Sequence, residues 1–230
     1  MENLSGLTPE EKARLLDLEK SVELDKARPV IKKDFLSFVK YVWPEFIEGS
    51  HHKKINKKFN DLASGKIKRL IINMPPRHTK SEFASYLLPA WMVGLDPRLK
   101  IIQATHTADL AIDFGRKTKN LVDQPNYKQL FDTRLMEDSQ AAGKWKTEQG
   151  GEYFAAGVGG AITGRGADLL IIDDPHKEQD IKKDSKSFDK AWNWYTSGPR
   201  QRLQPGGRIV VVMTRWSTKD ITGQLIKAQG

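Results

Sequence analysis

Cysteine is absent from the 230-residue sequence, so the chain forms neither a disulfide framework nor a cysteine-ligated zinc site. A reducing intracellular compartment fits this composition best. Long apolar runs are also absent, and residues 1–20 carry too many charges for a secretory signal. We therefore expect a soluble cytoplasmic protein without a membrane span.

Internal repeats and low-complexity linkers are lacking as well. The length suits one large α/β domain, or one domain with an appended helical segment, and either can bury a substantial core. Acidic residues are outnumbered by basic ones. The sequence has 29 Asp and Glu residues and 38 Lys and Arg residues, which give a net charge of +9. This excess favours a polyanionic partner such as nucleic acid or nucleotide, although a solvated basic surface has the same composition.

Helices are predicted throughout residues 1–64. The first has Thr8 as its N-cap, with Pro9 at the first helical position and Glu11 completing a capping box. Pro29 is expected to end it, because proline lacks the backbone N–H of a helix interior. The three helices are expected at residues 9–28, 32–43 and 52–66, and we expect them to form a segment that packs on a core at residues 65–230.

Beyond residue 65, short apolar runs alternate with helical patterns. Apolar runs with little polar alternation predict strands buried on both faces of a mainly parallel sheet. They lie at residues 67–74, 100–106, 168–174 and 207–214, and the helical candidates lie at about 80–93, 107–121, 184–196 and 218–228. Pro89 predicts a kink in the first of these helices. Residues 145–157 read as a hairpin around Gly150 and Gly151.

The stretch "IINMPPRHTKSEF" predicts a strand, a turn and a helix that begins near Lys80 and Ser81. These two residues are those of a phosphate-binding loop, in which the Lys reaches the phosphates and the hydroxyl ligates magnesium. The glycines of the usual G-x-x-x-x-G-K-[ST] pattern are missing here. Taken alone, the turn is better interpreted as a proline-rich connection between two buried elements. The candidate nucleotide-binding residues of the turn are Pro76, Arg77, His78, Thr79, Lys80 and Ser81.

A pair of carboxylates provides a second test of this reading. Asp173 and Asp174 follow the apolar run "LLII", at the carboxyl end of a predicted strand, where open α/β sheets bind ligands. Asp173 is expected to hold magnesium together with Ser81, and Asp174 to orient the attacking water, with Glu178 or Asp180 as alternatives. The competing interpretation is a strand-terminating turn with solvated acids.

Two further motifs carry candidate functional residues. Arg165 lies between two glycines in "ITGRGADLL" and is a candidate to stabilise phosphoryl transfer, with Arg77, Arg200 and Arg202 as alternatives. Thr214 ends the predicted strand of "GRIVVVMTRW" and is a candidate sensor of the γ-phosphate. Equally, "TRW" could close a strand, with Trp216 packed under the sheet.

These motifs, in this order, resemble the ATPase domain of the large terminase subunit of tailed bacteriophages. The matching stretches are "GKIKRLIINMPPRHTKSE" as a glycine-poor Walker A, "GGAITGRGADLLIIDDP" as the approach to Walker B, and "MTRWSTKDITGQL" as the coupling motif. The resemblance implies a P-loop NTPase with a RecA-like core of the additional-strand type, and magnesium-dependent ATP hydrolysis. The usual Walker B Glu is replaced by Asp174.

The resemblance also implies a homo-oligomeric ring on the procapsid portal, in the host cytoplasm, that moves double-stranded DNA. Its implied partners are the portal protein and the small terminase subunit, the chain alone is expected to be a monomer, and Arg165 matches an arginine finger acting in trans. A nuclease domain follows the ATPase domain in that family. We therefore expect this chain to hydrolyse ATP without cleaving DNA. No adenine-reading Gln is evident; Trp43, His51 and His52 are candidates for that contact.

Two other functions remain open at this point. A helicase-like ATPase acting on nucleic acid would usually bring a second RecA-like domain, which this length does not contain. A non-enzymatic module that binds DNA or capsid would carry a degenerate phosphate loop. The Lys-rich stretches at residues 52–59 and 181–190 are candidate DNA contacts, or simply solvated faces.

Overall fold

The computed structural model describes residues 8–162, 164–177 and 186–229. Seven strands form one sheet, in the order β1-β7-β6-β2-β5-β4-β3. The strands are β1 (Arg69–Asn73), β2 (Lys100–Thr105), β3 (Leu135–Ala141), β4 (Lys144–Thr147), β5 (Glu152–Gly157), β6 (Ala167–Asp173) and β7 (Leu203–Met213). The helices are α1 (Pro9–Lys33), α2 (Phe35–Val42), α3 (Ser50–Ala63), a π-helix (Glu82–Leu87), α4 (Leu88–Leu95), α5 (Ala108–Asp123), α6 (Pro125–Leu130), α8 (Lys186–Ser197), a 3₁₀ turn (Pro199–Arg202) and α9 (Ile221–Gln229).

The sheet is mainly parallel, as the apolar runs predict. Strands β1, β7, β6, β2 and β5 pair in parallel, and β4 and β3 extend the sheet in antiparallel order. Strand β7 lies between β1 and β6, so an additional strand separates the one before the predicted phosphate loop from the one that ends in Asp173. Its register aligns Asn73 with Met213 and Asp173 with Val212, and the polar residues after these strands therefore meet at one edge.

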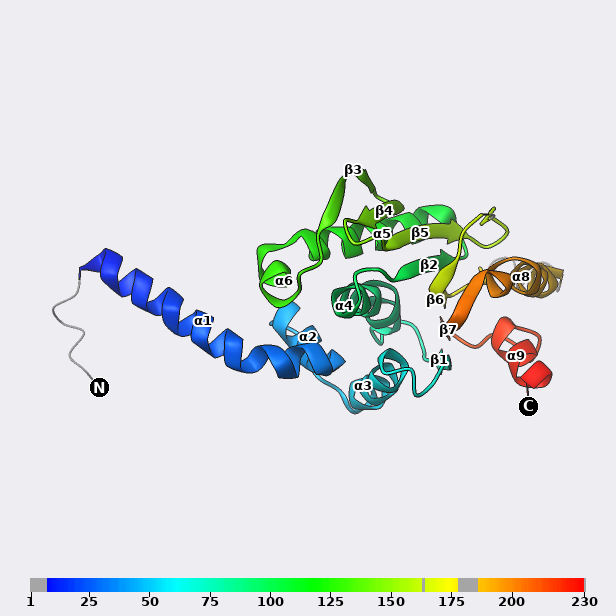
Figure 1. Ribbon diagram of the computed structural model, residues 1–230. Coiled ribbons are helices and arrows are strands. Elements are labelled where there is room, and N and C mark those ends of the chain that lie inside the picture. The colour runs from blue at the N-terminus through cyan, green and yellow to red at the C-terminus, as the bar shows by residue number, and fades with distance from the viewer. Residues whose placement is uncertain (1–7, 163, 178–185, 230) are drawn as a thin grey trace.

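Both faces of the central strands are covered by helices (Figure 1). Leu169 and Ile171 of β6 join a core with α2, α3, α4 and α5, whereas Leu170 and Ile172 join a second core with α8 and α9. Successive side chains of a strand point to opposite faces, so a strand between two layers needs apolar residues at every position. This explains the lack of polar alternation in these runs.

Strand β1 departs from this expectation. It pairs only with β7 among the described strands, and its residues alternate between exposed and half-buried. Ile71 remains 37% exposed. The prediction that this strand is buried on both faces is therefore wrong, because an apolar composition does not reveal whether a strand has neighbours on both sides.

Helix α1 does not end at Pro29. The capping box of Thr8 and Glu11 is present, but the helix continues through Pro29 to Lys33 and stops at Asp34, which also caps α2. The Asp34 carboxylate accepts hydrogen bonds of 2.7 Å from the side chains of both Asn56 and Asn60 in α3. The end of the helix is thus fixed by tertiary hydrogen bonds to α3.

The three N-terminal helices differ in how they contact the rest of the chain. Figure 1 shows most of α1 projecting away from the sheet. In contrast, α2 and α3 bury aromatic side chains against the helix that follows the predicted phosphate loop. The ring of Phe35 lies 4.9 Å from that of Phe59, 5.3 Å from that of Phe83 and 5.6 Å from that of Trp91, centroid to centroid, and all four side chains are buried.

The helix predicted at about 80–93 is divided into the π-helix and α4, and Pro89 lies in the first turn of α4. Pro89 has no N–H to donate to the carbonyl of Ser85, and π-turns inside helices are often found at functional sites. The hairpin of β4 and β5 is confirmed, with Trp145 stacked on Tyr153 at a centroid distance of 5.0 Å. Strand β3 and helix α6 were not predicted. The sequence of β3, "LMEDSQA", is too polar to indicate a strand.

No described helix has the length and apolar character needed to cross a membrane.

Candidate functional site

The predicted site residues gather beyond the carboxyl ends of β1, β6 and β7. A cleft of about 470 Å³ opens there. It is lined by Pro76, Lys80, His106, Asp174, His176, Lys177, Thr214 and Trp216. Trp216 therefore faces the cleft, 38% exposed, and the interpretation that packs it under the sheet is wrong.

The turn after β1 has an unusual backbone. Arg77 and Thr79 have positive φ angles of 63° and 59°, in the left-handed region that glycine usually occupies. Alternating residues of this kind turn backbone N–H groups toward one side, which is how backbone nests bind anions. His78 Nδ1 lies 2.8 Å from the Pro76 carbonyl oxygen, and the Thr79 carbonyl accepts the hydrogen bond from Phe83 that begins the following helix. The turn thus has a folded shape of its own and directs a helix N-terminus into the cleft.

Asp173 is buried and makes hydrogen bonds through both carboxylate oxygens. The Ser81 hydroxyl donates to Oδ1 at 3.1 Å and the Ser85 hydroxyl donates to Oδ2 at 2.7 Å. The residue is 2% exposed. Burial raises the pKa of Asp173 to about 6, and the nearby Asp174 charge adds to the increase, while the two serines and Lys80 oppose it. The site therefore contains a carboxylate that lacks a strong cationic partner.

Asp174 lies just beyond the strand end, with φ at 39°. Its Oδ2 is 2.8 Å from the Nζ of Lys80, whose side chain is 8% exposed. Its Oδ1 accepts a hydrogen bond of 2.8 Å from the backbone N–H of Thr214. The two aspartates therefore have separate partners, and Asp174 contacts two of the other candidate residues, Lys80 and Thr214.

The residues after β7 fold around Asp220, which sequence reasoning missed. Its carboxylate is fully buried and accepts hydrogen bonds from the N–H groups of Trp216, Ser217 and Gly223 and from Arg215 Nε, at 2.8 to 3.1 Å. Burial alone would raise the pKa of Asp220, but these hydrogen bonds lower it below its usual range. The "TRWSTKD" turn is thus held by a single buried carboxylate.

Other polar side chains around the site were also missed. Gln103, fully buried in β2, donates to the Ser85 hydroxyl at 3.0 Å and so continues the hydrogen-bond chain from Asp173. His106 Nδ1 lies 3.3 Å from the Asp174 carbonyl, and His176 Nε2 accepts from the N–H of Ile221 at the start of α9. A lone polar residue inside an apolar run, such as Gln103 in "KIIQAT", is the signal that would have identified the first of these.

Arg165 does not join the cluster. It lies just before the amino end of β6, paired with Glu152 at the start of β5 and 3.9 Å above the ring of Phe154. Because β5 and β6 run parallel to β2, this is the end of the sheet opposite Asp173. Arg200 and Arg202 precede β7 at the same end, whereas Arg77 is exposed in the turn itself. Within one chain, Arg77 alone of these arginines lies beside the cleft.

The remaining candidates fall in several places. His52 contacts the turn directly, with Nε2 2.7 Å from Thr79 Oγ1. Its ring lies 3.8 Å from that of His51, and Trp43 packs on Phe46. The lysines of the stretch at residues 52–59 all lie on the exposed face of α3. Glu178, Asp180 and the first half of the stretch at residues 181–190 lie outside the described residues.

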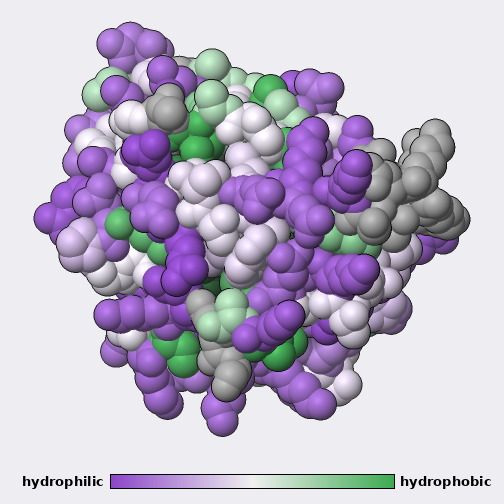
Figure 2. Space-filling model, turned by 90° about the vertical axis from the view of Figure 1, so that its right-hand side faces the viewer, coloured by the Kyte–Doolittle hydropathy of each residue, from purple (hydrophilic) through white to green (hydrophobic). Residues whose placement is uncertain are grey.

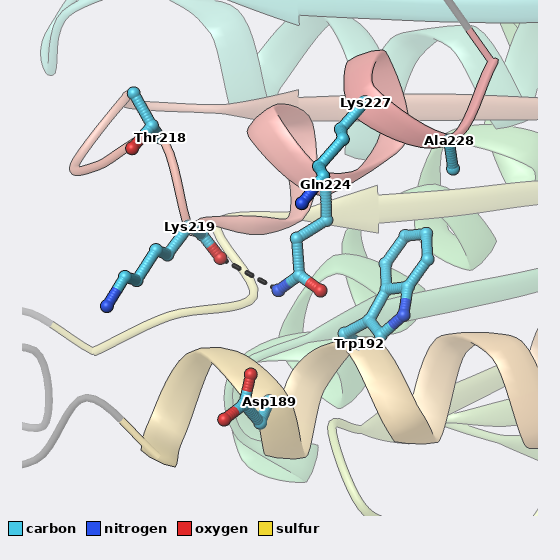
Figure 3. Close-up of a pocket in the computed structure, with 7 residues that line it drawn as sticks. All are labelled: Asp189, Trp192, Thr218, Lys219, Gln224, Lys227 and Ala228. Atoms are coloured by element: carbon cyan, nitrogen blue, oxygen red, sulfur yellow. Dashed lines mark hydrogen bonds between the residues drawn. The ribbon is translucent and has the colours of Figure 1, made fainter.

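A second hollow lies apart from this cleft, between α8 and α9 (Figure 3). It measures about 570 Å³ and contains Trp192, Gln224, Lys219 and Lys227 in its lining, with Gln224 bonded to the Lys219 carbonyl. None of the predicted phosphate or metal residues lines it. Figure 2, which views the α8 and α9 side, shows a largely hydrophilic surface with small separate apolar patches. This hollow is larger than the cleft, but it contains none of the predicted phosphate or metal residues. It is therefore not the candidate catalytic site.

The oxygen atoms around Asp173 fit a magnesium ion. Carboxylate and hydroxyl oxygens are the ligands that this ion prefers, and Ser81 and Asp173 present both kinds within 3.1 Å of one another. Among the described residues, no group of three or more His, Cys, Asp or Glu side chains could hold a metal ion. An ion held by Ser81 and Asp173 would have one or two protein ligands and would complete its shell with phosphate and water.

Comparison with known proteins identifies the architecture. No protein-family model and no curated protein matches this sequence. Among solved structures, the crystal structure of the HK97 bacteriophage large terminase superimposes with a TM-score of 0.56 and covers 86% of this chain. The fold is terminase-like. The sequence identity to the HK97 protein is 12%, so this likeness concerns the fold alone, and the chain spans 40% of that protein's length. The terminase-like fold agrees with the resemblance that the motifs carry.

Proposed function

We propose that this chain binds ATP with magnesium in the cleft and hydrolyses it. The observation that carries the proposal is the meeting of Lys80 and Ser81, from one strand end, with Asp173 and Asp174, from another. A phosphate loop and a carboxylate that holds magnesium must come together in this way for phosphoryl transfer. The left-handed turn before Lys80 adds backbone N–H groups for the phosphates, and Arg77 and His78 stand beside them.

The roles of the residues follow from their contacts. The Ser81 hydroxyl and Asp173 would hold the magnesium ion, which would supply positive charge beside the phosphate oxygens. Lys80 would leave Asp174 for the β- and γ-phosphates, because the two phosphate groups together carry more negative charge than one carboxylate. Asp174, freed from Lys80 and still bonded to the Thr214 N–H, orients the attacking water.

Thr214 connects the reaction to the rest of the fold. Its N–H bonds Asp174, and its hydroxyl lies 3.3 Å from the Met74 carbonyl at the end of β1. A change at Asp174 when the γ-phosphate leaves is thereby passed to the "TRWSTKD" turn, which Asp220 holds together. Coupling of this kind, in which a small shift at a phosphate moves a packed segment, is common in nucleotide-driven switches.

The wider proposal is a motor domain of a terminase large subunit that moves double-stranded DNA into a procapsid. The terminase-like fold, the net charge of +9 and the motif order support it. It includes a homo-oligomeric ring at the portal vertex in the host cytoplasm, contacts with the portal protein and the small terminase subunit, and Arg165 acting on a neighbouring chain. The four exposed lysines of α3 are candidate contacts for DNA phosphates.

Phosphate release from ATP, with and without double-stranded DNA, tests the proposal. We expect magnesium-dependent release that DNA increases, and a loss of at least about 100-fold in Lys80→Ala, because that change removes the main positive charge at the phosphates. Lys128→Ala, which removes a surface lysine paired with Asp123, is the matched control and should keep full activity. Equal inactivity of wild type and Lys80→Ala, with DNA binding intact, would instead support a non-enzymatic DNA-binding module.

A further inference from the structure

The turn at the nucleotide site places a β-branched residue in a conformation that normally requires glycine. Thr79, immediately before Lys80, has φ at 59°. For a β-branched side chain the left-handed region is a genuine outlier, and the backbone is strained there unless the surroundings hold it. Glycine stands at this position in the common phosphate-loop pattern because it adopts positive φ without strain. Some contact in this protein must offset the strain at Thr79.

His52, in the first turn of α3, makes that contact. Its Nδ1 accepts a hydrogen bond of 2.8 Å from the Gly49 N–H, so the ring proton lies on Nε2. Nε2 lies 2.7 Å from Thr79 Oγ1 and therefore donates to it, and the Thr79 hydroxyl donates in turn to the His78 carbonyl at 2.6 Å. The donor and the acceptor of each hydrogen bond in this series are therefore fixed. The Thr79 side chain is thus held at both its donor and its acceptor positions.

The imidazole ring is itself fixed by packing. His52 is 4% exposed, and its ring stacks on Phe83 at a centroid distance of 4.8 Å and meets the edge of Phe46 at 4.7 Å. Burial, and the nearby His51, lower the pKa of His52, so the neutral tautomer persists at neutral pH. A neutral, buried and stacked histidine is well placed to hold a neighbouring hydroxyl, and it has little access to solvent.

We propose that His52 is a positioning residue that holds Thr79 in the left-handed conformation and so gives a glycine-free turn the shape of a phosphate loop. The nucleotide part of this inference rests on the proposed function. It also makes α3, from the N-terminal helical segment, part of the nucleotide site. His52 acts through Thr79 and not on the reacting atoms, in contrast to the adenine contact considered from the sequence.

A double-mutant cycle between His52 and Thr79 tests the inference. We expect His52→Ala to weaken binding of a fluorescent ATP analogue with magnesium by about tenfold in the wild-type background. The change removes the hydrogen bond to Thr79 and leaves the strained backbone there without support. In a Thr79→Gly background the loss should be less than about threefold, because glycine needs no support at positive φ. His52→Gln, whose amide nitrogen can replace Nε2, should recover much of the affinity. Lys66→Ala, just beyond the end of α3, is the control.

Two further measurements separate the possible outcomes. If His52→Ala does not fold, His52→Phe keeps the stacking on Phe83 and removes only the hydrogen bonds, so it takes the place of the alanine variant. If wild type binds no ATP, the proposed function fails, and urea unfolding of the same proteins without nucleotide still tests the inference. Equal losses in the wild-type and Thr79→Gly backgrounds would overturn it, as would no loss in either.

Discussion

At the scale of single residues, the site is organised by where each carboxylate finds its partners. Asp174 pairs with Lys80, whereas Asp173 depends on two serine hydroxyls in a buried place. Neutral donors offset the cost of burying a charge less well than a cation does, which is why the pKa of Asp173 rises to about 6. A cation bound at this carboxylate would offset the cost of burying its charge.

The raised pKa of Asp173 predicts how stability depends on pH without magnesium or nucleotide. The folded protein holds this proton more tightly than the unfolded chain, whose Asp has a pKa of 3.8. The free energy of unfolding should therefore fall as pH rises from about 4 to 6 and stay low above that, by about 3 kcal/mol at 1.36 kcal/mol per pH unit. Asp173→Asn removes this loss, so it should be the more stable protein at pH 8 and lose its advantage near pH 4.

Urea unfolding of both proteins from pH 4 to pH 8 in the presence of a chelator measures the effect. A variant less stable than wild type at pH 8 would contradict it. Adding magnesium and ATP at pH 8 should stabilise wild type and not Asp173→Asn, because only the aspartate provides the anionic ligand.

At the scale of elements, the strands fix where the candidate residues lie, and the segments that follow the strands contain those residues. The turn after β1, the residues after β6 and the turn after β7 each end a parallel strand, and the register of the sheet brings them together. The π-helix after Lys80 carries Ser85 close enough to reach Asp173. The turn after β7 lacks regular structure between Thr214 and α9, and the buried Asp220 holds it in place.

Asp220 is therefore expected to determine both stability and turnover. Asp220→Ala leaves three backbone N–H groups and Arg215 without their acceptor, which should cost about 2–4 kcal/mol in the free energy of unfolding. Phosphate release should also fall, since Trp216 and Thr214 lose their fixed positions beside the cleft. Urea unfolding and an ATPase assay measure the two effects. Asp113→Ala, at an exposed ion pair with Arg116, should change neither, and a stable, active Asp220→Ala would refute this role.

At the scale of the whole molecule, the described residues form a sheet between two helical layers, and most of the candidate site residues gather at one edge of that sheet. Arg165 lies at the opposite end of that sheet from Lys80 and the aspartates. A residue in this place does not reach the cleft of its own chain, so it could act only on the cleft of a neighbouring chain. The terminase-like fold therefore keeps Arg165 as a candidate only if the protein assembles.

Mixing two inactive variants tests this assembly. Arg165→Ala should bind ATP but lose turnover, and Asp174→Ala should also be inactive. In an equal mixture, roughly a quarter of the interfaces in a randomly assembled ring pair an intact Arg165 with an intact Asp174, so part of the wild-type rate should return. Wild type at the same concentration is the control. An inactive mixture beside an active wild type would rule out the trans role.

Much of the fold could be predicted because a strand buried on both faces has a run of apolar residues with little polar alternation. Apolar runs predicted the strands of a parallel sheet, and polar residues after them predicted where Lys80, Ser81 and the aspartates would lie. Pro29 was misjudged because a local rule was overridden by contacts between α1, α2 and α3. The exposure of β1 was missed because strand order is not encoded within any one strand.

The sequence by itself determined which residues are candidates for the chemistry and at which end of their strands they lie. Only the tertiary structure decided which of them meet: Lys80 with Asp174, Ser81 with Asp173, and His52 with the strained Thr79. It also placed Arg165 away from all of them. The physical reason is that periodicity and propensity act over a few residues, whereas hydrogen bonds between distant segments depend on strand order and helix packing, which the whole chain sets together.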